Sequence, residues 1–191
     1  MSQPLKLDLG AGPNRIPSFT GVDRIAFPGV DVVCDLTERM KVDFVSPPRF
    51  KEWPWENESV SEIHSSHVVE HLEPAERIHF VNECHRILVP KGTATIITPH
   101  WCSQRAYGDL THKWPAVSEF WFHYLGREWR MANAPHTDRE HWSEGYTCDF
   151  DAVCTEIMNY NYPVRDKMAQ EFAKAYYKDA IDDLRTVLYK R

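Results

Sequence analysis

The chain has 191 residues, of which 42% are hydrophobic and 26% charged, a composition that suits one globular α/β domain with a sizeable core. Its net charge of -6 argues against phosphate contacts with nucleic acid over the whole surface, although it leaves room for a local basic groove. No apolar run approaches the length of a membrane span and no signal peptide is recognisable, so we expect a soluble, cytoplasmic protein.

The first predicted strand carries an acid and ends in a glycine turn. An apolar run at 5–9 surrounds Asp8 and stops at Gly10-Ala11-Gly12, where the absence of a Cβ lets the backbone approach a ligand closely. A second short run, 19–22, ends on Asp23. Two carboxylates are therefore expected near the carboxyl ends of neighbouring strands, where open α/β sheets bind ligands.

The spacing of this turn separates two cofactor classes. The dinucleotide fingerprint requires a third glycine three positions beyond Gly12, and Arg15 stands there. The remaining pattern, an acid, G-x-G and a downstream acid, resembles motif I of the class I S-adenosylmethionine-dependent methyltransferases. Ten positions separate Gly12 from Val22, too few for a full helix, so the first crossover is predicted to be truncated and partly irregular.

Two further strands are predicted before residue 70. Residues 29–35 form a third strand that also ends on an acid, Asp35. Pro47-Pro48 breaks any helix in 37–52, which is expected to be a loop or a short helix. A fourth strand is predicted at 60–66.

A helix and a fifth strand follow. The helix is predicted to begin at Glu73-Pro74, with proline in its first turn, and to end at Pro90-Lys91-Gly92. Ile78 and Val81 contribute to an apolar face at helical spacing. The β-branched residues 93–98 predict the fifth strand.

A series of motifs then makes the resemblance specific. N-x-S-V-x-E-I at 57–63, S-x-H-V-x-E-H-L at 65–72 and H-R-I-L-x-P-K-G at 85–92 follow motif I, Asp23 and Asp35-Leu36 in order. Together they resemble the type-11 branch of the class I methyltransferases. The resemblance implies a single Rossmann-like α/β domain over 1–191, with a seven-stranded sheet of order 3-2-1-4-5-7-6 whose last strand is antiparallel.

The remaining residues hold a variable region and the end of the sheet. Residues 99–146 are expected to form a substrate-side excursion over the active site, with a short helix at 118–125 capped by Ser118 and little periodicity at 127–146. A strand is predicted at 147–159 and a helix at 166–179. Residues 184–190 resemble the family's last strand, with apolar groups expected to face both layers.

Four residues of the first two strands are expected to hold S-adenosylmethionine. Asp8 fixes the turn and, directly or through water, the methionine ammonium group. Gly10 and Gly12 let the backbone approach the cofactor. Asp23 accepts hydrogen bonds from both ribose hydroxyls, because a carboxylate can accept from a vicinal diol with its two oxygens.

Four further cofactor contacts are implied by the resemblance. Asp35 receives the adenine amino group, with Leu36 beside the ring, while Ser66 and His67 face the methionine portion. The run 67–71 also matches the H-x-x-E-H pattern of inverted zinc proteases. Those proteases carry the pattern on a long helix, whereas here it follows a strand and precedes Pro74, so no metal site is expected.

The methyl acceptor and its base are the least specified parts of the prediction. Asp109-Leu110-Thr111-His112-Lys113 resembles a run that follows the fifth strand in one subgroup, with leucine in place of proline. His112 could accept a proton from an acceptor hydroxyl, with Asp109 orienting its ring and Lys113 attracting an anionic acceptor. His100 is the competing candidate, and an amine or an already ionised oxygen would need no base.

The sequence as a whole therefore predicts a methyltransferase that uses S-adenosylmethionine on a small-molecule, sugar or nucleotide-linked acceptor. Two alternatives remain open. One is the modification of a nucleobase or nucleoside, for which aromatic residues could stack a base. The other is a cofactor-binding regulatory subunit without catalysis, which a missing Asp23 or a missing glycine would have favoured. The oligomeric state is not indicated.

Overall fold

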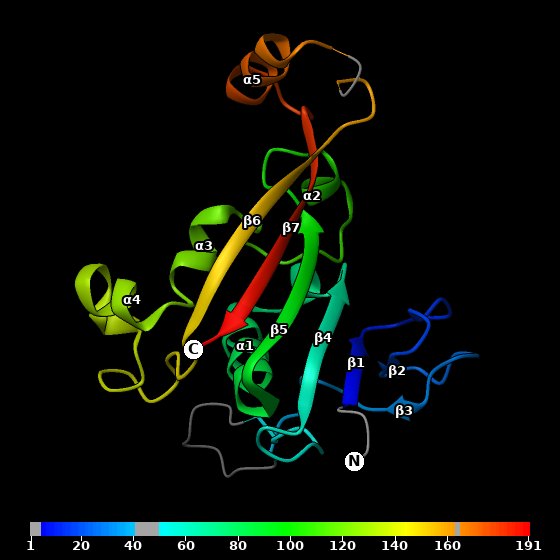
Figure 1. Ribbon diagram of the computed structural model, residues 1–191, viewed down its shortest axis with the longest axis vertical. Coiled ribbons are helices and arrows are strands. Elements are labelled where there is room, and N and C mark those ends of the chain that lie inside the picture. Colours follow the sequence, from blue (N-terminus) through cyan, green and yellow to red (C-terminus); the bar gives the residue numbers. More distant parts are fainter. Residues whose placement is uncertain (1–4, 41–49, 163–164) are drawn as a thin grey trace.

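A computed structural model describes residues 5–40, 50–162 and 165–191. The described strands form one sheet in the order β3-β2-β1-β4-β5-β7-β6, in which β7 is antiparallel to both neighbours and the other pairs are parallel. The predicted strand order is confirmed, and it is the order of the class I methyltransferase fold (Figure 1). The strands are β1 (Leu5–Leu9), β2 (Thr20–Asp23), β3 (Val32–Val33), β4 (Val60–Ser66), β5 (Leu88–Pro99), β6 (Phe150–Met158) and β7 (Ile181–Lys190).

Short helices connect the second half of the sheet. They are α1 (Pro74–Ile87), α2 (Arg105–Gly108), α3 (Glu119–His123), α4 (Arg127–Asn133) and α5 (Lys167–Tyr176), with 3-10 turns η1 (Val69–His71) and η2 (Pro135–Thr137). Within the ranges that the structure describes, no helix has the length and apolarity needed to cross a membrane.

The crossover from β1 to β2 contains no helix, as its length predicts. The amides of Gly10 and Ala11 both donate to the Val22 carbonyl, at 2.8 and 3.0 Å, which folds the chain back against β2. The buried carboxylate of Asp8 accepts from the Ile16 amide at 2.9 Å. Hydrogen bonds to the backbone thus stabilise this irregular crossover, which is too short to form a helix that packs against the sheet.

Helix α1 begins where the proline signal places it. Pro74 occupies the first turn, and the Glu73 and Glu76 side chains form a capping box with each other's backbone amides. Its apolar face, which includes Ile78 and Val81, is buried, and the helix lies behind β5 in Figure 1. This burial, more than helix propensity, holds the short helix in place.

The predicted end of α1 is wrong by three residues. The helix stops at Ile87, and β5 begins at Leu88, which is fully buried and pairs with Val60 of β4. Pro90, Lys91 and Gly92 therefore lie inside β5, where the pairing register shifts and Lys91 takes a φ of 66°. Strand pairing at Leu88 has overridden the helix-stop signal further along the chain.

Three other local expectations need correction or restriction. The third strand is confined to Val32–Val33 within the predicted 29–35. Ser118 precedes α3, but its side chain makes no capping hydrogen bond. Pro47-Pro48 lies outside the described residues.

The segment 127–146 contacts α1 and lies far from β1 to β3. Asn82 of α1 donates to the Gly145 carbonyl at 3.1 Å and accepts from the Thr147 amide at 2.8 Å. Arg130 of α4 is fully buried and pairs with Asp138 at 2.8 Å. In Figure 1, α4 lies on the opposite side of the molecule from β1 to β3. Within the expected excursion 99–146, only the part before α4 approaches the carboxyl ends of the first strands.

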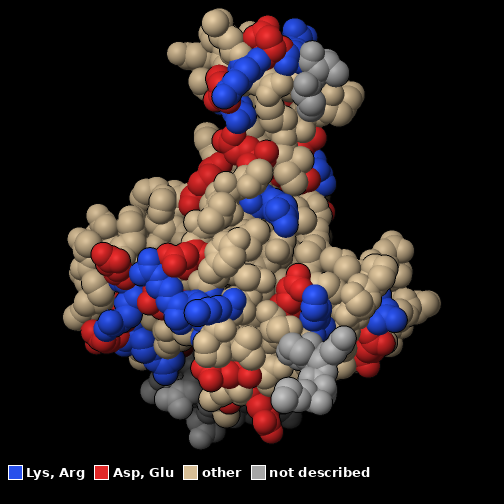
Figure 2. Space-filling view, in the orientation of Figure 1, with Lys and Arg blue, Asp and Glu red and all other residues tan. Residues whose placement is uncertain are grey.

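The two faces of the sheet differ in burial. On β7, Leu184 and Leu188 are fully buried toward the helical layer, whereas Arg185 is exposed and Tyr189 is 44% exposed on the other face. Apolar groups therefore occur on both sides of this strand, as expected, but Val187 and Tyr189 on the second side are only partly buried. Figure 2 shows the face opposite α1, which is mostly uncharged.

Candidate functional site

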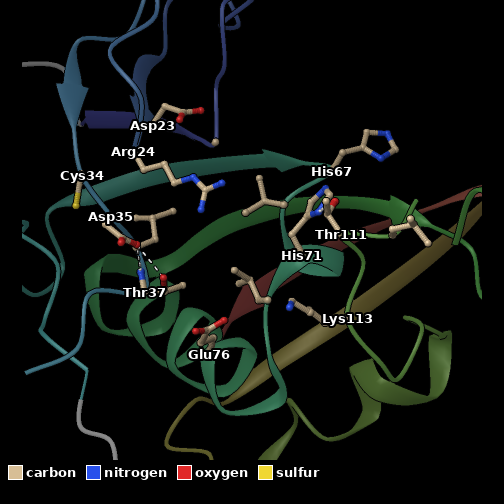
Figure 3. Close-up of a pocket in the computed structure, with 15 residues that line it drawn as sticks. Asp23, Arg24, Cys34, Asp35, Thr37, His67, His71, Glu76, Thr111 and Lys113 are labelled. Carbon is tan, nitrogen blue, oxygen red and sulfur yellow. Dashed lines mark hydrogen bonds between the residues drawn. The ribbon is translucent and has the colours of Figure 1, made fainter. Parts of the chain in front are cut away.

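A cavity of about 690 Å³ lies at the carboxyl ends of β1, β2 and β4. Figure 3 shows Asp23 and Arg24 on one side of it and His71, Thr111 and Lys113 on the other. Parallel strands place their carboxyl ends at one edge, so residues far apart in sequence meet here. Five residues predicted to bind the cofactor line the cavity: Gly10, Asp23, Asp35, Leu36 and His67.

Asp23 is held at the end of β2 by backbone donors. Its Oδ2 accepts from the Gly12 amide at 3.0 Å, and its Oδ1 accepts from the Ile25 amide at 2.9 Å. Each carboxylate oxygen can accept more than one hydrogen bond, so both keep capacity for a ligand. The carboxylate is thus oriented by the turn while it lines the cavity.

Gly10 and Gly12 have different structural roles. A Cβ on Gly10 would lie 2.2 Å from Cγ2 of Val68, and its φ is +73°. A Cβ on Gly12 would meet nothing within 4 Å, although its φ is +54°. The absence of a Cβ at Gly10 therefore leaves room for the Val68 side chain in the cavity wall. At Gly12 the positive φ alone favours glycine, and this conformation directs its amide toward Asp23.

Asp8 lies outside the residues that line the cavity. It is 4% exposed, and its two oxygens contact the Ile16 amide at 2.9 Å and His64 Nδ1 at 2.8 Å. Asp8 therefore fixes the crossover, while its contact with a methionine ammonium group stays a prediction.

The loop after β3 supplies a second carboxylate to the cavity. Oδ1 of Asp35 accepts from the amide and hydroxyl of Thr37, at 2.9 and 2.8 Å. Leu36 is nearly buried, and its carbonyl accepts from the indole of Trp53 at 3.1 Å. Trp53, itself 4% exposed, packs edge-on against Phe80 of α1, which ties this loop to the core.

The turn after β4 contributes His67, which has a φ of 56°. Its amide donates to the Ile97 carbonyl at 2.9 Å, and its Nδ1 donates to Oε1 of Glu70 at 3.1 Å. The hydrogen bond to Glu70 raises the pKa of His67 above its ordinary value. Ser66, at the end of β4, does not line the cavity.

Residues 110–113 cross the cavity and are held by Arg77 of α1. This guanidinium is almost fully buried and donates to the carbonyls of Leu72, Pro115 and Lys113 at 3.0, 2.6 and 2.9 Å. The amide of Lys113 also donates to the Glu70 carbonyl at 2.8 Å. One buried side chain thus joins the turn after β4 to the segment that covers it.

The structure separates the candidate catalytic residues. His112 and Asp109 line an adjoining cavity of about 590 Å³, which shares His67, His71 and Leu110 with the first. Nε2 of His112 lies 3.8 Å from Oδ2 of Asp109. The Thr111 hydrogen bonds lower the pKa of Asp109 below its ordinary value.

His100 belongs to a different environment. It is 3% exposed, its Nε2 lies 2.6 Å from Oε1 of Glu119, and its Nδ1 lies 2.9 Å from Sγ of Cys102. It lines a third cavity that also includes Tyr107 and shares no lining residue with the first.

The lining of the first cavity includes charged or polar side chains that sequence reasoning did not assign to the site, among them Arg24, His71 and Glu76. Arg24 extends from the end of β2 into the cavity, and Glu76 reaches it from the first turn of α1 (Figure 3). The position directly after Asp23 could have indicated Arg24, and the E-x-x-E capping pattern could have indicated Glu76. His71 comes close to Thr111 only through long-range folding.

Comparison with known proteins supports the fold but not a family. No family model matches the chain, and no curated protein sequence matches it. A structure described as an SAM dependent methyltransferase from Archaeoglobus fulgidus aligns with a TM-score of 0.58 and 14% identity, over 98% of this chain and 86% of that one.

A second similar structure is the 1,6-didemethyltoxoflavin-N1-methyltransferase of Burkholderia thailandensis, solved with 1,6-didemethyltoxoflavin and S-adenosylhomocysteine. It aligns with a TM-score of 0.55 and 14% identity, over 98% of this chain and 71% of that one. At such identities the similarity establishes the fold alone.

Proposed function

We propose that this chain is an S-adenosylmethionine-dependent methyltransferase of the type-11 branch of class I. The single observation that carries the proposal is the oriented carboxylate of Asp23 at the carboxyl end of β2, beside the glycine turn and in a cavity of about 690 Å³. The fold and the motif series of the first hundred residues support the same cofactor.

The proposed cofactor pose follows the polar groups of the cavity. Asp23 accepts from the ribose hydroxyls, and Asp35 with Leu36 holds the adenine at the end of β3. His67 and the Gly10 turn lie beside the methionine portion, and Asp8 and Ser66 act from behind the cavity wall. The pose directs the sulfonium methyl group toward residues 110–113.

The proposed reaction is an in-line displacement at the methyl carbon. The attacking atom of the acceptor forms a bond to that carbon while the sulfonium sulfur leaves with the C–S electron pair, which yields S-adenosylhomocysteine. For a hydroxyl acceptor, His112 is the proposed proton acceptor and Asp109 its neighbour, with Lys113 near an anionic group. His100 is a weaker candidate because its cavity shares no lining residue with the first cavity, whereas the cavity of His112 shares three.

The acceptor is proposed to be a small molecule, a sugar or a nucleotide-linked compound. A nucleobase or nucleoside acceptor is the alternative within enzyme chemistry, and a regulatory subunit without catalysis is the alternative outside it. These possibilities differ in what the cofactor does once it is bound, so turnover separates them.

The test is the release of S-adenosylhomocysteine from a panel of hydroxyl, amine and nucleoside acceptors. We expect release with at least one acceptor by the parent protein, and its loss in Asp23→Ala. Once an acceptor is known, His112→Ala and His100→Ala are compared at several pH values, with cofactor affinity measured in parallel. Tight cofactor binding without turnover on any acceptor would favour the regulatory alternative.

A further inference from the structure

Three potential metal ligands converge beside the first cavity. Glu70 and His71 lie in η1, and His112 lies in the segment that crosses the cavity. One ligand atom from each lies within 4.8 Å of the others. The imidazole rings of His71 and His112 are 4.7 Å apart, centroid to centroid, in an edge-on arrangement. The convergence depends on folding, since His112 is distant in sequence.

The hydrogen bonds around His71 determine which of its nitrogens is free. Its Nδ1 lies 3.0 Å from the hydroxyl oxygen of Thr111, and that hydroxyl donates to Oδ1 of Asp109 at 2.7 Å. Because a carboxylate only accepts, the Thr111 hydrogen is already used, and the Nδ1–H of His71 must donate to Thr111. In the neutral imidazole, Nε2 of His71 is therefore the nitrogen that carries the lone pair.

The same argument applies to His112. Its Nδ1 lies 3.3 Å from the Ala106 carbonyl oxygen, which can only accept, so Nδ1 carries the hydrogen. Its Nε2 is left as an acceptor, and the nearest carboxylate oxygen, from Asp109, is 3.8 Å away. Both rings are thus held in the tautomer that leaves Nε2 able to bind a metal ion.

Glu70 supplies an independent observation. Its side chain is 5% exposed, and His67 donates to Oε1 at 3.1 Å. Oε2 is buried and has no hydrogen-bond partner among the described residues. A buried carboxylate oxygen without a partner is energetically costly, which points to a cation or donor that the protein itself does not provide.

We propose that Glu70, His71 and His112 form a binding site for a divalent transition metal ion of the zinc class. Two histidines and one glutamate are a donor set of catalytic zinc sites, in which a further coordination position stays open. Thr111, the Ala106 carbonyl and His67 orient the three ligands, as outer groups do around such ions. All three proposed ligands line the cavity that Asp109 and Leu110 also line.

This site differs from both earlier roles of its residues. It does not use the H-x-x-E-H spacing, because His67 donates to Glu70 and His112 supplies the second imidazole. A bound ion also occupies the His112 lone pair that a general base would need. The metal site and the base are therefore alternative states of His112, whereas cofactor binding at Asp23 depends on neither.

The test begins with full-length protein treated with EDTA and dialysed. Zn²⁺ binding is measured by calorimetry, and Co²⁺ binding by its visible d–d absorption. We expect one equivalent to bind with micromolar or tighter affinity, with a spectrum that lacks thiolate bands. Glu70→Gln and His112→Ala should weaken binding at least about 100-fold, and Thr111→Val, which perturbs an outer group, about 10- to 100-fold. His136→Ala, an exposed histidine on η2, is the matched control.

Circular dichroism in EDTA checks that each variant is folded. Because Thr111 is exposed, Thr111→Val should fold normally and therefore tests the site even if Glu70→Gln is unstable. The proposal is overturned if the parent binds neither ion, if His112→Ala binds as tightly as the parent, or if Co²⁺ shows thiolate ligation. Titration of S-adenosylmethionine in EDTA reports on the cofactor site separately.

Discussion

Arg77 offers a direct test of how the covering segment is held. Arg77→Met keeps most of the buried stem but removes the guanidinium, which donates to the carbonyls of Leu72, Pro115 and Lys113 and, at 3.5 Å, to that of Glu70. Burial lowers the pKa of this guanidinium below its usual value, so part of its hydrogen-bond energy offsets desolvation. The substitution leaves these four carbonyls without this donor.

The magnitude follows from these contacts. A hydrogen bond to a charged group contributes about 1.5–3 kcal/mol, and contributions within one network are not additive. After the desolvation cost is subtracted, we expect Arg77→Met to reduce the free energy of unfolding by about 3–5 kcal/mol. S-Adenosylmethionine affinity should fall as well, because residues 110–113 lose their anchor.

Urea denaturation followed by tryptophan fluorescence measures the effect. Arg139→Met, at an exposed arginine in the segment beside α1, is the matched control and should change the free energy of unfolding by less than about 0.5 kcal/mol. A loss below about 1 kcal/mol in Arg77→Met would refute the argument that this side chain anchors the covering segment.

Three further predictions concern the fold. Gly10→Ala should destabilise the protein more than Gly12→Ala, because only a Cβ at position 10 would overlap Val68. Urea denaturation of both variants checks this, and adding Val68→Ala to Gly10→Ala should recover part of the lost stability. Burial, with help from Lys190, lowers the pKa of His85 to about 4. The unfolded chain therefore takes up this proton near pH 6.5, while the folded chain does not. Stability consequently falls between about pH 6.5 and 4, by less than about 3 kcal/mol because solvent screens the partly exposed ring. His85→Leu should flatten that acid limb in pH-dependent denaturation, and an unchanged slope would contradict the assignment. Truncation before Leu184 removes most of β7, the interior antiparallel strand between β5 and β6, and should abolish soluble folding. A well-folded truncated protein would contradict the importance of that strand.

Sequence reasoning succeeded where a local pattern coincides with burial. The limits of β4 match the prediction because its alternating residues lie on the two unequal faces of the sheet. The end of α1 was misplaced because Leu88 pairs with Val60, a contact that no local signal at 90–92 reveals. The side chains on the second face of β7 stay partly exposed because, in the described chain, no helix packs against that face. No local pattern in the strand reveals this.

The candidate site divides in the same way. Asp23 and Gly10 follow from a turn at a strand end, a feature that sequence carries locally. The contact of His71 with Thr111, and the cluster that includes His112, depend on a segment returning to the sheet edge after β5. Spacing between such residues is set by tertiary structure, so their shared chemistry becomes visible only in three dimensions.

The central claim is that the cavity binds S-adenosylmethionine with its ribose on Asp23. The most direct measurement is calorimetric titration of the parent protein, Asp23→Ala and a control, Asp151→Ala on β6, with folding verified by circular dichroism. We expect the parent and the control to bind alike, and Asp23→Ala to bind more weakly by roughly 2–4 kcal/mol, about 30- to 1,000-fold. Absence of binding by the parent, or equal affinity in folded Asp23→Ala, would contradict the claim.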